Sequence, residues 1–390
     1  MKPAELTLPI PYGRQHITDA DISAVVSTLK SDYLTQGPKL AQFEEAFANY
    51  VGATYAVGCA NGTAALHLCT LALGVPEGKK VIGTPLTFAA SLNCVRYVRG
   101  EVDFVDIDPD TFLIDLNQVE DKLRKEPNAY AGIIPVDFAG YPVDLSSLRT
   151  LADRYGCWIV EDSCHAPGGY QETPSGSQSR CGSGEFADLA IFSFHPVKHI
   201  AAGEGGMVTT QDKDLYEKLK LFRTHGITKR PDLLQENHGG WYYEMHELGY
   251  NYRLSELQAA LGGSQLEKAN DRLARRRELA GIYDKAFQDT PIKAAPRPSH
   301  QGHAYHLYVV QAPRRKELYD YLRTQHIFTQ VHYIPVHLLP YYQKLGWKKG
   351  DFPYAEAYYD QCLSLPLYPS LSEVQQQYVI EQVKGFFQDF

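Results

Sequence analysis

Two stretches decide the fold: residues 158–169 read WIVEDSCHAPGG, and residues 187–209 read ADLAIFSFHPVKHIAAGEGGMVT. The first begins with an apolar run that ends at Asp162. The second holds an apolar run that ends near Ser193, and Lys198 follows on a short loop. A lysine and an aspartate at the ends of two buried strands suit pyridoxal phosphate (PLP). Its aldehyde needs a lysine, and its ring nitrogen needs a carboxylate.

The competing interpretation is that Lys198 is a solvated lysine and Asp162 a turn residue, which is the commoner case for such residues taken singly. Their matching positions favour the cofactor interpretation. No other lysine lies between an apolar strand and a glycine cluster like 203–206. The lysine works only as a neutral amine, so burial or a nearby cation must lower its pKa.

Composition bounds the class of protein. The chain has 390 residues, a net charge of −8 and a pI near 6.0, which argues against bulk binding to nucleic acid or acidic membranes. The seven cysteines lack CxxC spacing and are typical of free thiols in a reducing compartment, and we predict no metal site. No apolar segment resembles a signal peptide or a membrane span, so we expect a cytoplasmic protein.

A regular alternation of strands and helices begins at residue 55. The predicted strands are 55–60, 80–83, 102–106, 131–138 and 158–160, and the predicted helices between them are 63–73, 88–98, 116–125 and 145–155. This pattern predicts an α/β fold with a mostly parallel sheet between helices. In such sheets the ligand site lies at the carboxyl ends of the strands.

The flanking segments predict two domains. Thr18 can cap a helix over 19–29, and a long helical stretch over 254–287 contains Gly262 and Gly263, which allow a kink or close packing. Strand-like segments and a last helix follow, at 303–312, 328–336 and 373–387. We therefore predict a large ligand-binding domain at 1–253. Residues 254–390 would form a bridging helix and a smaller C-terminal α+β domain.

The first strand–helix junction, CANGTAA at residues 59–65, is a candidate phosphate site. Free amides at the start of a helix bind anions, Gly62 allows close approach of the backbone, and Thr63 adds a hydroxyl. Taken alone, the same letters also describe an ordinary turn and helix cap. Ser193, on the strand that leads to Lys198, can reach the same phosphate.

Two further residues suit a bound pyridine ring. Phe88 follows the second strand and could stack on the ring, although a core phenylalanine is the commoner use. Asp162 would keep the ring nitrogen protonated. His165 could then form a hydrogen bond with the ring hydroxyl or with Asp162.

Six motifs together resemble the DegT/DnrJ/EryC1/StrS sugar aminotransferase family over nearly the whole chain. They are LTQGP (34–38), GCANGTAALHL (58–68), EDSCHA (161–166), FSFHPVKHI (192–200), GEGG (203–206) and LGYNYRLSELQAALG (248–262). The resemblance implies a PLP-dependent transaminase with the aspartate-aminotransferase-like type I fold.

The resemblance also implies a role for each matching residue. Lys198 matches the lysine that bonds to the cofactor aldehyde, Asp162 the partner of the ring nitrogen, and His165 the residue beside the ring hydroxyl. Gly62, Thr63 and Ser193 match the phosphate site. Asn251 matches an asparagine that reaches the phosphate from the other subunit, which implies a homodimer with shared active sites. The chain departs from the family at Ala201 and Ala202, where Thr-Thr is common, and at His199.

Four segments carry a narrower likeness: PYGRQ (11–15), SFHPVKHI (193–200), VHYIPVHLLPYYQKLGW (331–347) and GDFPYAEAYYD (350–360). They resemble family members of the pseudaminic acid pathway, which aminate C4 of a UDP-linked 4-keto-6-deoxy-N-acetyl-L-hexosamine with L-glutamate as donor. The product is UDP-4-amino-4,6-dideoxy-N-acetyl-beta-L-altrosamine. The implied substrate contacts are Tyr12, Tyr33, Leu34 and Thr35, with His332 and Tyr333 as further candidates that could equally be structural.

Other functions stay open at this point. The acceptor could be UDP-4-keto-6-deoxy-GlcNAc or GDP-4-keto-6-deoxymannose. A sugar-nucleotide dehydratase of the same fold is disfavoured by Lys198, because such relatives carry histidine there. A regulatory protein with a PLP fold but no activity is the alternative outside enzymes.

Overall fold

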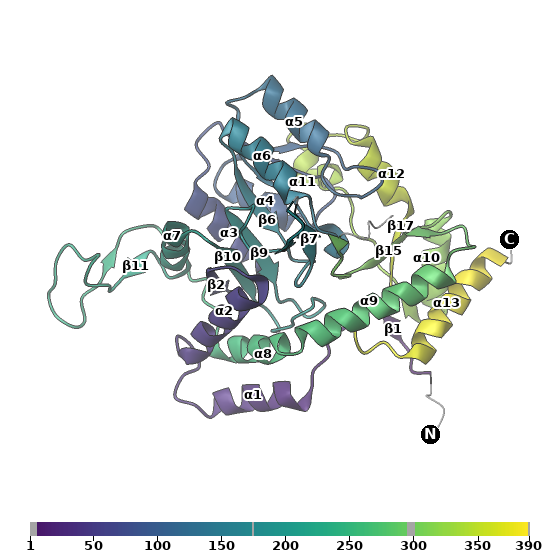
Figure 1. Ribbon diagram of the computed structural model, residues 1–390, viewed down its shortest axis with the longest axis horizontal. Helices are drawn as coiled ribbons and strands as arrows, with labels where there is room; N and C mark the ends of the chain where they lie inside the picture. Colours follow the sequence, from purple (N-terminus) through teal and green to yellow (C-terminus); the bar gives the residue numbers. More distant parts are fainter. Residues whose placement is uncertain (1–5, 174, 295–300, 389–390) are drawn as a thin grey trace.

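A seven-stranded sheet forms the centre of the molecule, in a computed structural model that describes residues 6–173, 175–294 and 301–388 (Figure 1). Its strands, in spatial order, are β2 (Tyr55–Cys59), β10 (Gly206–Thr210), β9 (Leu189–Ser193), β6 (Trp158–Asp162), β5 (Tyr130–Ile134), β3 (Lys80–Gly83) and β4 (Glu101–Phe104). From β9 to β4 all neighbours are parallel, and only β10 runs antiparallel to its two neighbours. The predicted mostly parallel α/β sheet is confirmed.

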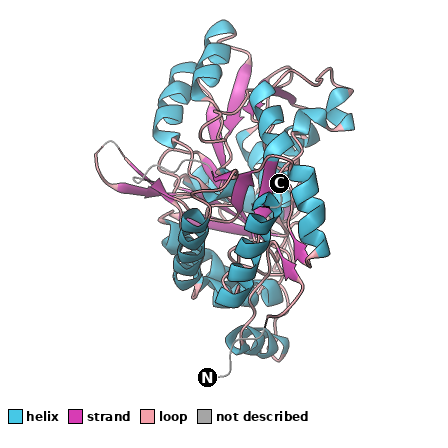
Figure 2. Ribbon diagram, turned by 90° about the vertical axis from the view of Figure 1, so that its right-hand side faces the viewer, coloured by secondary structure: helices cyan, strands magenta, loops and turns pink. Residues whose placement is uncertain are grey.

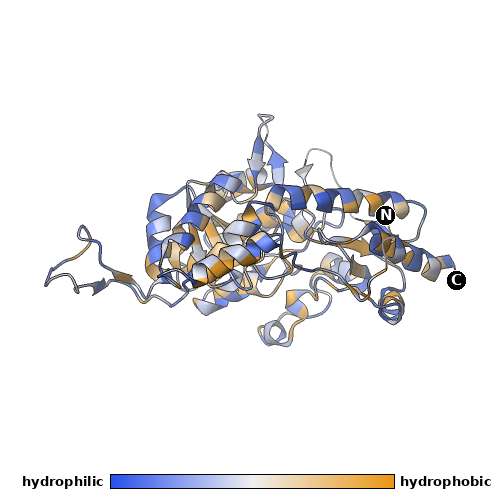
Figure 3. Cartoon of the chain, turned by 90° about the horizontal axis from the view of Figure 1, so that it is seen from below, coloured by the Kyte–Doolittle hydropathy of each residue, from blue (hydrophilic) through white to orange (hydrophobic). Residues whose placement is uncertain are grey.

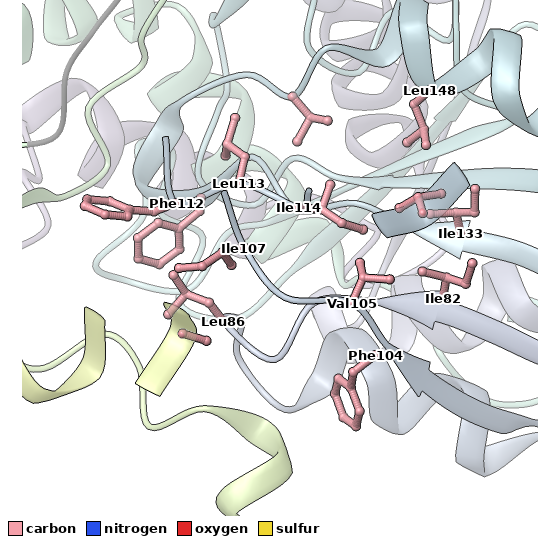
Figure 4. Packing of buried hydrophobic residues seen from close by; sticks show 14 of the residues in the cluster. Ile82, Leu86, Phe104, Val105, Ile107, Phe112, Leu113, Ile114, Ile133 and Leu148 are labelled. Carbon is pink, nitrogen blue, oxygen red and sulfur yellow. The ribbon is translucent and has the colours of Figure 1, made fainter. Parts of the chain in front are cut away.

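Both faces of this sheet are buried, because consecutive strand residues point to opposite sides. Ile133 and Ile159 belong to one hydrophobic cluster, while Ile134 and Val160 belong to another. Helices α5 (Leu116–Lys125) and α6 (Leu145–Tyr155) contribute to the first cluster, part of which Figure 4 shows. Helices α3 (Gly62–Leu73), α4 (Ala90–Tyr97) and α7 (Lys213–Arg223) contribute to the second. Figure 2 shows helices on both sides of the strands.

Side-chain caps fix where several helices begin. Asn61, Asp115, Asp144 and Asp212 each accept a hydrogen bond from an amide in the first turn of α3, α5, α6 and α7 respectively. Such caps satisfy donors that have no acceptor within the helix. Because α3 begins three residues after β2 ends, its cap also sets the position of the loop between them.

The predicted long helix over 254–287 is wrong in one respect, because it is two helices. Helix α8 (Glu256–Leu266) and helix α9 (Ala269–Ala286) are separated at Lys268, whose backbone leaves the helical range (φ −103°, ψ 5°). The break places the Lys268 ammonium 3.2 Å from the buried carboxylate of Asp21. Of the two uses expected of the glycine pair, a kink or close packing, the structure shows close packing at Gly262. Gly262 lets Phe43 approach, since a Cβ there would lie 2.7 Å from that ring.

The C-terminal region has its own small antiparallel sheet of β13 (Lys293–Ala294), β15 (Tyr308–Gln311) and β17 (Cys362–Leu365). A hydrophobic cluster joins it to α9, α10 (Arg315–Thr324) and α13 (Glu373–Gln388). Ile10 of β1 (Ile10–Pro11) also lies in this cluster, because β1 pairs with β16 (Ile327–Phe328). The start of the chain thus packs with its end, and the division at residues 253 and 254 stays a prediction.

The two C-terminal strand predictions were too long. Within 303–312 only Tyr308–Gln311 is a strand, and within 328–336 only Phe328, the last residue of β16, belongs to a strand. Residues 304 and 307 instead donate backbone hydrogen bonds to the carbonyls of Gly140 and Ala139, at 2.7 and 3.2 Å. This segment therefore connects to the loop after β5 rather than extending the small sheet.

A two-stranded arm projects from the body of the molecule (Figures 1 and 3). It consists of β11 (Ile227–Thr228), β12 (Glu244–Met245) and the residues between and after them, 227–248. Its large apolar side chains face solvent, with 74% of Trp241 and 76% of Leu248 exposed. Exposed apolar groups gathered on a projection are typical of a surface that contacts another chain. Within the part of the chain that the structure describes, no helix has the length and apolar character needed to cross a membrane.

Candidate active site

A cavity of about 460 Å³ opens at the carboxyl ends of β6 and β9. Its walls contain these predicted site residues: Tyr12, Gly62, Thr63, Phe88, Asp162, His165, Ser193, Lys198, His332 and Tyr333. The sheet brings the central ones together, because β6 and β9 are parallel neighbours with Asp162 opposite Ile191. The cavity therefore lies at the sheet edge that the sequence predicts.

Asp162 is buried and held by hydrogen bonds from two sides. Its Oδ2 accepts from the Ser91 hydroxyl at 2.7 Å, and its Oδ1 accepts from the Cys164 amide at 3.2 Å. The Ser91 oxygen lies 2.7 Å from the Thr87 hydroxyl. These contacts fix the carboxylate so that it can accept a hydrogen bond from a protonated ring nitrogen.

Lys198 lies in the loop between β9 and β10, where its amide donates to the His195 carbonyl at 2.8 Å. The side chain lines the cavity and is half-buried. Burial lowers the pKa of the Lys198 amine, while the nearby Cys164 and Asp162 act in the opposite direction. A lowered pKa increases the fraction of neutral amine, which is the form that can bond to an aldehyde and take up a proton.

The start of α3 forms a compact anion site. The Asn61 side chain caps the helix by accepting from the Ala64 amide at 2.8 Å, and the leading amides of the helix have no intrahelical acceptor. Glycine is needed at position 62 for α3 to pack this closely on β9, because a Cβ there would come within 3.0 Å of the Ser193 Cβ. The hydroxyls of Thr63 and Ser193 lie on the wall of the same cavity.

These residues fit PLP as a set. The anion site at α3 suits its phosphate, the fixed carboxylate suits its ring nitrogen, and the lysine suits its aldehyde. Phe88 is 60% exposed beside the cavity, so the interpretation of this residue as core is wrong, and its ring can cover a face of a planar ligand.

His165 is buried, and protein groups occupy both of its ring nitrogens. Its Nδ1 accepts from the Ala139 amide at 3.2 Å, and its Nε2 lies 3.1 Å from the Tyr333 hydroxyl. The pKa of His165 is lowered well below its usual value, first by burial and then by Lys198. Its hydrogen-bond partner is thus Tyr333 rather than Asp162.

A buried arginine fixes the segment behind His165. Arg276 of α9 donates through Nη1 to the carbonyls of Tyr305, His306 and Leu367, at 3.1, 3.2 and 3.0 Å. The His306 ring lines the cavity, with its centre 4.4 Å from that of His165. Burial, then Lys198, His165, His199 and Arg276, lower the pKa of His306 well below its usual value, which keeps its imidazole neutral.

His199 ties the lysine loop to the same segment. Its Nε2 lies 2.7 Å from the Ala304 carbonyl, so this nitrogen carries the proton and donates it. The departure from the family pattern at this position therefore forms a specific contact. Burial, followed by Arg276, lowers the pKa of His199 well below its usual value.

The wall opposite the sheet comes from the two ends of the chain. The rings of Tyr12 and His332 lie 5.1 Å apart, and His332 Nδ1 lies 2.8 Å from the Ser364 hydroxyl. Phe88 and Tyr333 have ring centres 6.1 Å apart. This wall is aromatic and polar, which suits a sugar bound next to the cofactor.

Four predicted residues do not line this cavity. Tyr33, Leu34 and Thr35 are exposed in the loop between α1 (Asp19–Leu29) and α2 (Pro38–Val51), where the Leu34 carbonyl accepts from the Glu256 amide. Asn251 is exposed and forms a backbone bridge with Thr224. Within a single chain these four residues do not meet the cavity. Their predicted contacts with a ligand therefore remain predictions, which a second copy of the chain could satisfy.

Several lining residues were not identified from the sequence as site residues. The polar ones among them are Thr87, Ser91, Cys164, His195, Glu204 and His306, while Asn61 belongs to the phosphate site predicted at 59–65. Thr87 and Ser91 have a usable signal, since they lie four residues apart just after a strand that reaches the site. His306 has none, because it approaches the site only through the packing of the C-terminal region.

Comparison with known proteins identifies the family of this chain. The DegT/DnrJ/EryC1/StrS aminotransferase family matches residues 15–384. The spore coat polysaccharide biosynthesis protein SpsC of Bacillus subtilis is 39% identical over 96% of both chains. A UDP-4-amino-4,6-dideoxy-N-acetyl-beta-L-altrosamine transaminase of Campylobacter jejuni is 37% identical over 93% of both.

Solved structures agree as well. Helicobacter pylori PseC, an aminotransferase of pseudaminic acid biosynthesis, superposes with a TM-score of 0.88 at 31% identity, covering 98% of this chain and all of PseC. Solved sugar aminotransferases of similar structure include PLP and pyridoxamine phosphate forms. The chain belongs to the DegT/DnrJ/EryC1/StrS family and is a PLP-dependent nucleotide-sugar aminotransferase.

Proposed function

We propose that this enzyme transfers the amino group of L-glutamate to C4 of a UDP-linked 4-keto-6-deoxy-N-acetyl-L-hexosamine, giving UDP-4-amino-4,6-dideoxy-N-acetyl-beta-L-altrosamine. The observation that carries the proposal is the 37% identity, over 93% of both chains, with the C. jejuni transaminase named for that product. The likeness to PseC supports the same substrate class.

PLP, when bound, supplies an electron sink and carries the amino group between the two substrates. The protein supplies the rest. Lys198, whose pKa burial lowers, supplies the amine that can take a proton from the substrate carbon and return it. Asp162, fixed by Ser91, holds the proton on the ring nitrogen. The start of α3 and Ser193 bind the phosphate and so set the position of the ring against Lys198.

We also infer a homodimer with shared sites. The projecting arm exposes Trp241, Met245 and Leu248, which a second copy would cover. Asn251 follows the arm and lies outside this chain's own cavity, as expected for a residue that serves the neighbouring site. The loop at 33–35 is exposed in the same way.

The test is a panel assay with purified protein, PLP, L-glutamate and keto sugars linked to UDP, GDP or dTDP. We expect amination of the UDP-linked 4-keto-6-deoxy-N-acetyl-L-hexosamine with release of 2-oxoglutarate, detected by mass spectrometry. Lys198→Ala should abolish turnover, whereas Lys213→Ala, at the start of α7, should not. Full turnover by Lys198→Ala would contradict the role of this lysine.

A second acceptor has support of its own. SpsC, at 39% identity, is named for spore coat polysaccharide biosynthesis rather than for the altrosamine product. UDP-4-keto-6-deoxy-GlcNAc and GDP-4-keto-6-deoxymannose therefore belong in the panel. A higher kcat/KM for either one would replace the first acceptor while leaving the reaction type unchanged.

A further inference from the structure

The direction of one hydrogen bond determines the others around His165. The Ala139 amide can only donate, so the His165 Nδ1 that lies 3.2 Å from it must be the acceptor. Burial and the neighbouring Lys198 lower the pKa of His165, which keeps the ring neutral with a single proton. That proton is therefore on Nε2.

His165 then acts as a donor toward Tyr333. Its Nε2 lies 3.1 Å from the Tyr333 hydroxyl oxygen, which must accept. The hydroxyl hydrogen of Tyr333 is therefore not used in the contact with His165. Among residues 6–173, 175–294 and 301–388, the Tyr333 hydroxyl has no other hydrogen-bond partner.

The surroundings of Tyr333 leave its hydroxyl hydrogen one direction. Its ring is held among Phe88, Phe138 and His332, with ring centres 6.1, 6.2 and 4.9 Å away. A phenol hydrogen prefers the plane of its ring, and the His165 proton blocks the side it occupies. Because Tyr333 lines the cavity, a ligand bound there can supply the acceptor that the hydroxyl hydrogen lacks among the described residues.

We propose that Tyr333 is a hydrogen-bond donor to an oxygen atom of the bound ligand, and that His165 is the positioning residue that orients it. The acceptor is an oxygen that carries negative charge during the reaction. The cavity offers two sources of such an oxygen, the ring hydroxyl of the cofactor and the carbonyl of the keto sugar. The second source rests on the proposed function.

Tyr333 keeps its proton while it donates. Burial raises the pKa of Tyr333, and Tyr12, Asp162 and Cys164 raise it further. Lys198 and His332 share the cavity, and burial lowers the pKa of His332 to about 3, so it adds no charge. The hydroxyl thus stabilises an anionic oxygen without transferring its proton.

The first experiment needs no activity. Nitrogen-15 NMR of histidine-labelled, cofactor-free protein, assigned with His165→Gln, should show the His165 proton on Nε2, and Tyr333→Phe should shift that signal. A proton on Nδ1 would overturn the proposal. This readout on wild-type protein stands even if a variant folds poorly.

The second experiment separates the two oxygen sources. If Tyr333 donates to the cofactor, Tyr333→Phe should shift the pH midpoint of the bound cofactor's visible absorbance. If it donates to the sugar carbonyl, the variant should keep that midpoint and slow only the half-reaction with the keto sugar, by roughly 100-fold. Tyr342→Phe, which removes a buried hydroxyl bonded to Asn93, is the matched control.

Variants of His165 test the positioning role. His165→Ala should reproduce the Tyr333→Phe effect, and His165→Gln, which keeps a donor nitrogen, should restore part of it. An unchanged midpoint together with unchanged rates in Tyr333→Phe would overturn the proposal. If the wild type aminates none of the sugars, the proposed function fails, while the NMR and absorbance results still decide the role of Tyr333.

Discussion

Ser91 donates a hydrogen bond to Asp162, and the contribution of this bond can be measured. Removing the 2.7 Å hydrogen bond in Ser91→Ala leaves one side of a buried carboxylate without its donor. A hydrogen bond to a charged group contributes about 1.5–3 kcal/mol, so we expect kcat/KM to fall by roughly tenfold to hundredfold. Thr87→Val, which removes the hydroxyl behind Ser91, should have a smaller effect. Equal kcat/KM in Ser91→Ala and wild type would contradict this role.

A second carboxylate next to Asp162 should affect stability rather than turnover. Glu161 and Asp137 are both buried and lie together with Cys181, and Glu161 accepts from the Gly182 amide at 2.9 Å. Burial raises the pKa of Glu161 well above its usual value, and the charge of Asp137 raises it further. Glu161 therefore stays protonated in the folded state over a pH range in which it ionises in the unfolded chain.

This difference predicts how stability depends on pH. An acid with a raised folded pKa stabilises the protein below its unfolded pKa, and that contribution is lost as pH rises toward the folded pKa. Urea unfolding should be measured for Glu161→Gln and wild type at pH 5, 6.5 and 8. The free energy of unfolding of the variant should rise relative to that of wild type as pH rises, by at most about 1.4 kcal/mol per pH unit. Glu126→Gln, at an exposed ion pair, is the control. A difference independent of pH would show that Glu161 is ionised in the folded protein.

Sequence reasoning succeeds for single residues when the chemistry depends on strand ends. Lys198 and Asp162 were predicted together because each follows a buried apolar run, and the cavity contains both. Ser91 was missed because its contact joins a helix to a distant strand, and no local pattern encodes that contact. His165 was placed correctly in the cavity, but its partner Tyr333 could not be predicted, since the two meet only after the C-terminal region packs.

At the scale of elements, helix α1 depends on one buried carboxylate. Asp21 accepts from Ser264 at 2.7 Å and from Gln265 at 2.8 Å, and it pairs with Lys268. Burial raises the pKa of Asp21, but the hydrogen bonds from Ser264, Thr18 and Lys268 outweigh it and lower the pKa to about 2. The link between α1 and α8 is thus strongest when Asp21 is ionised.

Asp21→Asn should destabilise the protein in a pH-dependent manner. A carboxyl with a lowered folded pKa contributes stability above its unfolded pKa of 3.8, and the contribution is lost as pH falls toward 2. We expect a loss of about 1–2 kcal/mol in urea unfolding at pH 7, and a smaller difference from wild type at pH 3. Asp19→Asn, on the same helix turn, is the matched control. An equal loss of unfolding free energy at both pH values would mean that the packing of the Asp21 side chain, and not its charge, stabilises α1.

The elements themselves were predicted where caps and periodicity agree. Residues 80–83, 116–125 and 145–155 match the observed β3, α5 and α6, the last two with an aspartate cap in front. The break between α8 and α9 was missed because Glu267 and Lys268 are both good helix formers. The tertiary ion pair with Asp21 fixes that break, and helical periodicity does not reveal it.

At the scale of the whole molecule, the proposed sharing of active sites between two subunits can be tested by complementation. Lys198→Ala removes the amine, and Asn251→Asp places a negative charge where a phosphate contact is proposed. Each variant alone should be inactive as a homodimer. Co-expressed, they should recover roughly a quarter of wild-type activity, because half of the random dimers contain one intact site.

Two outcomes would contradict the shared sites. One is full activity of Asn251→Asp alone. The other is an absence of recovery when sedimentation shows that mixed dimers have formed. A monomer in solution with wild-type turnover would remove the dimer from the mechanism altogether.

The global arrangement of the cavity was predictable only in part. The sheet wall follows from the strand–helix alternation and its known ligand edge. The opposite wall joins Tyr12 to His332 and Tyr333, from opposite ends of the chain, and the sequence offers no pattern that pairs them. Resemblance to the family supplied these residues, and packing of β1 against β16 shows why they meet.

The contacts of Arg276 have a consequence for how this family can diverge. All three of its acceptors are backbone carbonyls, at residues 305, 306 and 367, and every amino acid has a carbonyl to offer. Side chains at 305 and 367 can therefore drift without weakening the link, whereas position 276 cannot change to lysine and keep a planar donor. Homologues should vary at the accepting positions and keep arginine at the donating one.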